Sequence, residues 1–258
     1  MASHEKHQAR PVHAADRNGD NDLPGVAVYV DLDNTVIDGS ALFHVGRALA
    51  AQGLLERGVL MRMAAHHAVY RIAGERPRLI DAARERSLGL AAQLRVDDVL
   101  DSVTQMYDKI LAPRLSMGMV ARLDAHRRAG AHVWLATAAP VELAELIAFR
   151  LGLSGALGTR AEVVDGAWTG RPDGQLLHGQ AKACAVTDHA VEHGWDLADC
   201  VAYSDSLQDM PLLSAVGHPC AVNPERSLRL IAQRRGWPVL QFRDGQARRR
   251  MRVARRSS

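Results

Sequence analysis

The sequence predicts an α/β protein in which a parallel sheet carries an inserted set of helices. Short apolar runs rich in β-branched residues recur along the chain, as buried parallel strands require. Stretches with helical periodicity separate most of these runs, as the crossovers between parallel strands do. One long stretch after the first run shows helical periodicity alone. Together these observations indicate a Rossmann-like parallel sheet core with an inserted helical cap domain.

Length and composition are those of a globular protein. The chain has 258 residues, of which 47% are hydrophobic and 24% charged, and this balance excludes wholesale disorder and collagen-like repetition. No apolar run approaches the roughly 20 residues that a membrane span needs. The three cysteines form no CxxC pair, which argues against a disulfide framework or a zinc knuckle. We therefore expect a cytoplasmic protein with buried, reduced thiols and no membrane span.

The two ends of the chain differ from the rest. Residues 1–24 are polar, aperiodic and without the apolar middle of a signal peptide, so they are predicted to be a disordered leader. Residues 243–258 form a basic, Arg-rich tail. The net charge of the chain is +3, and without the six arginines of residues 247–258 it becomes −3. A solvated tail is the simpler interpretation, and contact with an acidic surface is the alternative. We expect no nucleic-acid partner, and the oligomeric state stays open.

Five apolar runs are predicted to be strands, and helices lie between most of them. The first strand is VAVYVDL, which is short and rich in β-branched residues. Gly130 closes one helix in a position suited to a left-handed cap, and Pro140 stands where the next helix begins. The predicted strands cover residues 26–32, 131–137, 200–204, 218–222 and 237–242. The predicted helices between them cover residues 115–129, 141–151, 180–193 and 224–235.

Two irregular stretches interrupt this alternation. From Ala41 to about Ala112 the apolar residues follow only a helical period, which predicts a cap over residues 40–112. The core then comprises residues 25–39 and 113–242, with Gly39 as a hinge at the first joint. The second stretch is AEVVDGAWTG, where an Asp-Gly pair between two short β-like runs indicates a hairpin.

Two carboxylates mark the end of the first predicted strand. Asp31 and Asp33 flank Leu32, and because side chains alternate along a strand, both carboxylates point the same way. Paired carboxylates are costly unless a cation such as Mg²⁺ holds them, and their repulsion splits the two pKa values. An ordinary polar turn is the alternative for this motif on its own.

The ends of two further strands and one helix add polar groups. Thr137 ends the strand over 131–137, where a hydroxyl and backbone N–H groups suit a phosphate oxygen. Asp205 follows the strand over 200–204, with Asp209 one helical turn beyond. Lys182 stands near the start of the preceding helix and could neutralise phosphate charge. Since ligands of open α/β sheets bind at the carboxyl ends of the strands, these groups are expected to share one crevice.

The set of residues resembles the haloacid dehalogenase-like phosphatases. Their pattern is DxDxT, a Ser or Thr that ends a strand, a Lys, and an acidic pair near the last core strand. The chain offers Asp31-Leu32-Asp33-Asn34-Thr35, then Thr137, Lys182, and Asp205 with Asp209. The helical insert and the AEVVDGAWTG hairpin are similar to the subgroup that contains phosphoserine phosphatases.

This resemblance implies a role for each residue. Asp31 would be the nucleophile that forms an aspartyl-phosphate, and Asp33 the general acid and base. Mg²⁺ would be held by the Asp31 carboxylate, the Asp33 backbone carbonyl and Asp205. Thr137 and Lys182 would bind the transferred phosphoryl group. Asp209 would orient Lys182 or complete the outer shell of the metal.

Three positions depart from the phosphoserine phosphatases. Ser40 stands where they carry an acid nine positions after the nucleophile, which helps to bind the amino group of the substrate. Ala138-Ala139 replaces their Gly-Gly pair, and Gln208 stands where many relatives have Asn. These departures argue against phosphoserine as the substrate.

The sequence thus predicts a Mg²⁺-dependent phosphomonoester hydrolase that acts on a small phosphorylated metabolite through a phospho-aspartate. Phosphorylated amino acids, amino alcohols and histidinol phosphate remain open as substrates. A phosphotransferase that uses the same intermediate is one alternative function. A non-catalytic binding module that docks through its basic tail is the other.

Overall fold

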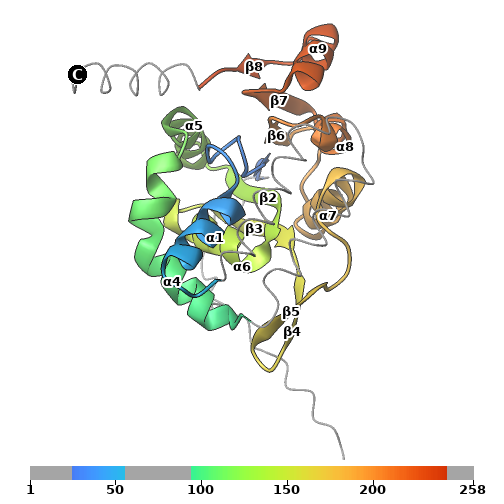
Figure 1. Cartoon of the computed structure of the whole chain (residues 1–258). Coiled ribbons are helices and arrows are strands. Elements are labelled where there is room, and N and C mark those ends of the chain that lie inside the picture. The colour runs from blue at the N-terminus through green and yellow to red at the C-terminus, as the bar shows by residue number, and fades with distance from the viewer. Residues whose placement is uncertain (1–24, 56–93, 243–258) are drawn as a thin grey trace, which may run out of the picture.

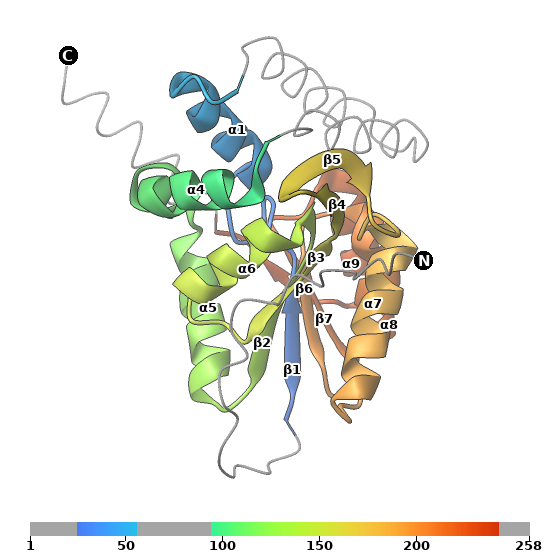
Figure 2. The ribbon, with the colours of Figure 1, turned by 90° about the horizontal axis from the view of Figure 1, so that it is seen from below.

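A six-stranded parallel sheet forms the centre of the molecule. The structure is a computed structural model that describes residues 25–55 and 94–242. Strand β1 lies in the middle, between β2 and β6, and the order across the sheet is β3-β2-β1-β6-β7-β8 (Figures 1 and 2). The strands are β1 (Ala27–Val30), β2 (His132–Pro140), β3 (Gly155–Thr159), β6 (Val201–Ser204), β7 (His218–Val222) and β8 (Val239–Leu240).

Helices cover both faces of this sheet, as the crossover connections require. On one face lie α5 (Met117–Arg128) and α6 (Val141–Arg150), and on the other lie α7 (Gly179–Glu192), α8 (Met210–Ala215) and α9 (Arg226–Arg235) (Figure 2). The buried side chains accordingly form two clusters, one on each face. This three-layer arrangement confirms the predicted α/β class.

The cap that was predicted over residues 40–112 is described at its two ends. Helix α1 (Ala41–Ala51) follows β1, and α4 (Val96–Ile110) leads back to the core, where the two helices contact each other. Buried residues of both helices, among them Val45 and Val103, belong to the same apolar cluster as the neighbouring sheet face. The middle of the predicted cap, residues 56–93, lies outside the described residues, as do the predicted leader and the predicted tail.

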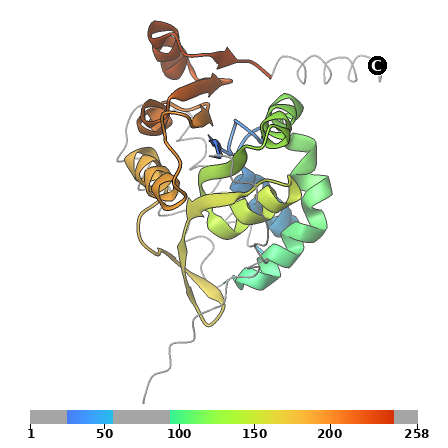
Figure 3. The same ribbon diagram turned by 180° about the vertical axis from the view of Figure 1, so that it is seen from behind.

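The Asp-Gly hairpin is present and touches the returning end of the cap. Strands β4 (Ala161–Val164) and β5 (Ala167–Pro172) pair antiparallel around Asp165 and Gly166, which both have positive φ. The N–H of Val96 donates to the carbonyl of Gly166 at 3.0 Å, and the N–H of Trp168 donates to the carbonyl of Leu94 at 3.1 Å. The hairpin is therefore hydrogen-bonded to the start of α4, and the views of the ribbon from the front and from behind show the two side by side (Figures 1 and 3).

Some sequence predictions were wrong. Strand β3 was not predicted, because GALGT contains two glycines and lacks an apolar β-branched residue. It becomes a strand through its pairing with β2. The cysteines were expected to be buried, but Cys184 is exposed, whereas Cys200 and Cys220 are buried as free thiols.

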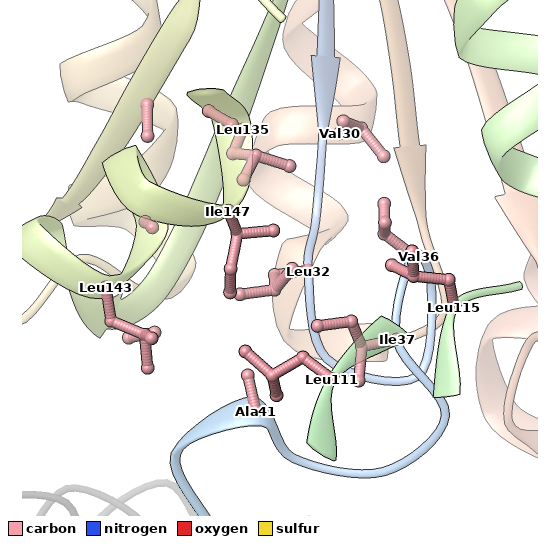
Figure 4. Close-up of a cluster of buried hydrophobic side chains, with 14 of the residues drawn as sticks. Val30, Leu32, Val36, Ile37, Ala41, Leu111, Leu115, Leu135, Leu143 and Ile147 are labelled. Carbon is pink, nitrogen blue, oxygen red and sulfur yellow. The ribbon is translucent and has the colours of Figure 1, made fainter. Parts of the chain in front are cut away.

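The turn after β1 is anchored by apolar side chains. Leu32 lies between the two carboxylates in sequence and is fully buried with Ile37 and Ile147 in one cluster (Figure 4). Burial of Leu32 in this cluster anchors the turn that carries Asp31 and Asp33 on either side of it. None of the described helices is long and apolar enough to cross a membrane.

Candidate active site

The predicted site residues lie at the carboxyl ends of adjacent strands. Asp31 directly follows β1, and its N–H donates to the carbonyl of Tyr203 in β6 at 2.9 Å. Thr137 lies in β2 on the other side of β1, and Asp205 directly follows β6. Parallel strands end at one edge of their sheet, so these three segments lie at the same edge.

Lys182 forms the centre of a buried charged group. Its Nζ donates to Asp31 Oδ1 at 2.7 Å and to Asp209 Oδ2 at 2.9 Å. Asp31, Lys182 and Asp209 are 8%, 2% and 3% exposed, so water screens these contacts little. Lys182 reaches this place from the first turns of α7, and Asp209 from the short 3-10 helix Leu207–Asp209 that follows β6.

Burial and charge act in opposite directions on the pKa values of this group. Burial lowers the pKa of Lys182, but Asp209 and Asp31 outweigh this effect and hold it above its ordinary value. The pKa of Asp31 is raised to about 7, mainly by burial and in smaller part by Asp209 and Asp33, while the Lys182 ammonium opposes this shift. One ammonium faces two carboxylates, so the fully ionised group carries a net negative charge. An added cation would stabilise the ionised form of Asp31.

Ser204 holds Asp209 in place. Its Oγ donates to Asp209 Oδ2 at 2.7 Å, and the Ser204 side chain is fully buried. One carboxylate oxygen thus accepts from both a hydroxyl and the Lys182 ammonium. Nothing in the sequence indicates this role, because any small polar residue could end the strand.

Asp33 is tied to the first helix of the insert. Its Oδ1 accepts a hydrogen bond from the N–H of Ala41, the first residue of α1, at 2.9 Å. Ser40 precedes the helix and accepts from the N–H of Phe43 at 3.4 Å, so its side chain acts as the N-cap. Gly39 has φ +83°, and an added Cβ there would lie 2.9 Å from His44 Nε2. This turn directs the start of α1 toward the Asp33 carboxylate.

Thr137 is buried at the place where a phosphate oxygen was expected. It is 2% exposed, and its Oγ1 accepts from the N–H of Ala139 at 3.1 Å. A second buried threonine, Thr159, donates from its Oγ1 to the carbonyl of Ala138 at 2.9 Å. Sequence reasoning missed Thr159, because it lies on the strand that was not predicted.

The residues predicted to hold a metal ion lie in the segments that follow β1 and β6. Asp205 adjoins Ser204 at the end of β6, and its carbonyl accepts from the N–H of Glu225 at 3.0 Å. Within residues 25–55 and 94–242, no three His, Cys, Asp or Glu side chains form a group that could hold a metal ion. The predicted metal set differs from such a group, since it takes two carboxylates and the backbone carbonyl of Asp33.

The chain is similar to known proteins in sequence and in fold. The model of the haloacid dehalogenase-like hydrolases matches residues 28–214. Phosphoserine phosphatase SerB1 of Mycobacterium tuberculosis is 42% identical over 236 residues, which cover 90% of this chain and 76% of the relative. A protein of unknown function from Bordetella pertussis has a TM-score of 0.75 at 29% identity and covers 84% of this chain and 99% of its own. A phosphoserine phosphatase in apo form shares the fold, with a TM-score of 0.58, 18% identity and coverage of 80% and 90%.

These matches define the class of protein. The chain belongs to the haloacid dehalogenase-like hydrolase family. The predicted family, fold class and phosphatase class are therefore confirmed. The roles of the single site residues, the metal and the substrate stay predictions.

Proposed function

We propose that this protein hydrolyses phosphomonoesters, with Asp31 as the nucleophile that attacks phosphorus. The observation that carries this proposal is the buried contact between Lys182 Nζ and the carboxylates of Asp31 and Asp209, at 2.7 and 2.9 Å. Lys182 holds one oxygen of Asp31 and brings a positive charge next to the reacting carboxylate. Charge neutralisation and positioning are the main needs of phosphoryl transfer, and this arrangement supports both.

Asp33 would serve as the general acid and base. It would donate a proton to the leaving alcohol, and then take a proton from the water that attacks the phospho-aspartate. The bond from Ala41 N–H to Asp33 Oδ1 supports this role, since it holds the carboxylate in a fixed position beside the nucleophile's strand end. Thr137 and Lys182 would bind the phosphoryl oxygens.

The residues present fit a Mg²⁺ ion. The donor set of Asp31, Asp205 and the Asp33 carbonyl consists of oxygen atoms, which Mg²⁺ prefers. The raised pKa of Asp31 supports the need for a cation, because its ionised form is otherwise disfavoured by burial. When bound, the ion would neutralise charge on the phosphoryl group and keep Asp31 ionised.

A small phosphorylated metabolite other than phosphoserine is the proposed substrate. The Ser40 side chain caps α1 and supplies no carboxylate that could pair with a substrate ammonium group. The proposed cap over residues 40–112 would enclose a small substrate, although its middle lies outside the described residues.

A phosphate-release screen across some tens of phosphorylated metabolites tests this function. The purified chain is assayed with Mg²⁺ and with a chelator, because the oxygen donor set predicts that activity needs the ion. We expect turnover of small phosphomonoesters with Mg²⁺, and a loss of at least about 100-fold with the chelator that added Mg²⁺ reverses. Activity that is unchanged in the chelator, or no phosphate release from any compound, would contradict the proposal.

A further inference from the structure

Thr159 connects two elements that carry proposed phosphate-binding groups. It ends β3, and its side chain is fully buried. Its Oγ1 donates to the carbonyl of Ala138 at 2.9 Å and accepts from the N–H of Leu177 at 3.0 Å. Ala138 directly follows Thr137, and Leu177 leads into α7, which carries Lys182. The hydroxyl of Thr159 therefore uses both its donor and an acceptor to join these two segments.

The peptide group between Ala138 and Ala139 is held at both ends. Its carbonyl accepts from Thr159, and its N–H donates to Thr137 Oγ1 at 3.1 Å. A peptide group is planar, so fixing the direction of its carbonyl also fixes the direction of its N–H. Donation to the carbonyl polarises the peptide and strengthens the bond that its N–H makes.

Among residues 25–55 and 94–242, Thr137 Oγ1 accepts a hydrogen bond and no partner takes its hydroxyl hydrogen. A hydroxyl has one hydrogen to donate and two lone pairs that accept. The N–H of Ala139 occupies one lone pair of Thr137 Oγ1, so the hydrogen turns away from that N–H. A phosphoryl oxygen above the strand ends would receive it.

We infer that Thr159 is a positioning residue for phosphoryl transfer. It orients the Thr137 hydroxyl through the Ala138–Ala139 peptide, and the bond from Leu177 N–H holds the Thr159 hydroxyl in the direction that this needs. This inference rests on the proposed phosphate-binding role of Thr137. A purely structural role is the alternative, because any loss of the Thr159 hydroxyl leaves two backbone groups unpaired.

The test compares three variants of the full chain. Thr159→Val keeps the shape and removes the hydroxyl, and Thr159→Ser restores the hydroxyl. Thr187→Val is the matched control, since the Thr187 hydroxyl also donates to a backbone carbonyl, that of Ala183 at 2.9 Å, but within α7. The readouts are kcat and KM for a chromogenic phosphomonoester, inhibition by inorganic phosphate, and the thermal midpoint.

We expect Thr159→Val to lower kcat/KM by about 10- to 100-fold and to weaken inhibition by phosphate. Thr159→Ser should stay within about 3-fold of the wild type, and Thr187→Val within about 2-fold. A double-mutant cycle separates positioning from general destabilisation. In a Thr137→Val background, Thr159→Val should cost less than about 3-fold, because the hydroxyl that it orients is already absent.

Equal losses in both backgrounds, or a loss of less than about 3-fold in Thr159→Val itself, would overturn the inference. If Thr159→Val does not fold, Thr159→Cys, whose thiol is a weaker donor, replaces it in the same cycle. The wild type separates this inference from the proposed function. If the wild type releases phosphate and Thr159→Val is as active as the wild type, the role of Thr159 is contradicted and the proposed function still stands.

Discussion

Lys182 shows how one residue stabilises buried charged groups that would be unfavourable alone. A buried ammonium or carboxylate is unfavourable alone, and removal of one partner leaves the other uncompensated. Here one ammonium meets two carboxylates, and Ser204 adds a hydrogen bond to Asp209. Asp209 is thus satisfied by two donors, whereas Asp31 is left with a raised pKa. That difference suits the assignment of Asp31 to the reaction and of Asp209 to holding Lys182.

Replacement of Asp31 tests this assignment. Asp31→Asn keeps the size of the side chain but removes the carboxylate, so kcat should fall by about 1000-fold or more. The control is Asp188→Asn, at an exposed position of α7 that carries Lys182. Rates are measured with a chromogenic phosphomonoester, and circular dichroism checks folding. An Asp31→Asn enzyme with full activity would eliminate Asp31 as the nucleophile.

At the scale of elements, the connection between β1 and α1 positions the Asp33 carboxylate. The turn from Asp33 to Ala41 returns the chain so that the first N–H of α1 meets the Asp33 carboxylate. Gly39 permits this turn, because it adopts a positive φ and leaves room for the His44 ring.

Substitution of Gly39 should therefore affect both stability and turnover. In Gly39→Ala, the backbone strain and the contact with His44 should destabilise the fold by about 1–3 kcal/mol and lower kcat. Gly53→Ala is the matched control, since Gly53 also has a positive φ, +77°, but an added Cβ meets no atom within 4 Å. Thermal unfolding and steady-state rates compare the two. Equal effects of both substitutions would show that the contact with His44 does not matter.

At the scale of the whole molecule, α7 links the active-site edge to the opposite part of the sheet. Lys182 lies near its start, and His189 packs farther along between Tyr29 and Trp134. His189 is 7% exposed, and Tyr29 OH lies 3.0 Å from its Nδ1. Its Nε2 has no hydrogen-bond partner within the part of the chain that the structure describes. The position of α7 thus depends on a histidine that is buried in its neutral form.

Acid should loosen this packing. Burial, with a smaller effect of His193, lowers the pKa of His189 to about 4. The histidine of the unfolded chain titrates near 6.5, so protonation favours the unfolded chain. The stability that neutral His189 contributes is present above this pH and is lost as the pH falls toward 4. Between pH 7 and pH 4, the free energy of unfolding of the wild type should fall by about 2–3 kcal/mol more than that of His189→Gln.

Denaturant unfolding at several pH values measures this difference. His218→Gln serves as the control, because His218 is exposed at the start of β7 and should leave the pH dependence of the wild type unchanged. If the stability of His189→Gln follows the wild-type curve throughout, His189 is not the group that titrates.

Much of the fold was predictable from local patterns, and β3 shows where this ends. Strands β1, β2, β6 and β7 were expected from their apolar runs, and the hairpin from Asp165-Gly166. These signals come from period and turn chemistry within a few residues. In β3, the glycines carry no such signal, and pairing with β2 makes the strand. Thr159 was missed with it.

The sequence by itself determined where most strands and helices lie along the chain and which types of residue end each predicted strand, because both depend on neighbours along the chain. Only the tertiary structure decided which of these groups meet. Lys182 and Asp31 are 151 residues apart, and their contact arises from the position of α7 against the sheet. The same holds for the bond between Asp33 and α1 and for the two contacts of Thr159. Burial and distance set the strength of a charge or a hydrogen bond, and both are properties of the packed molecule.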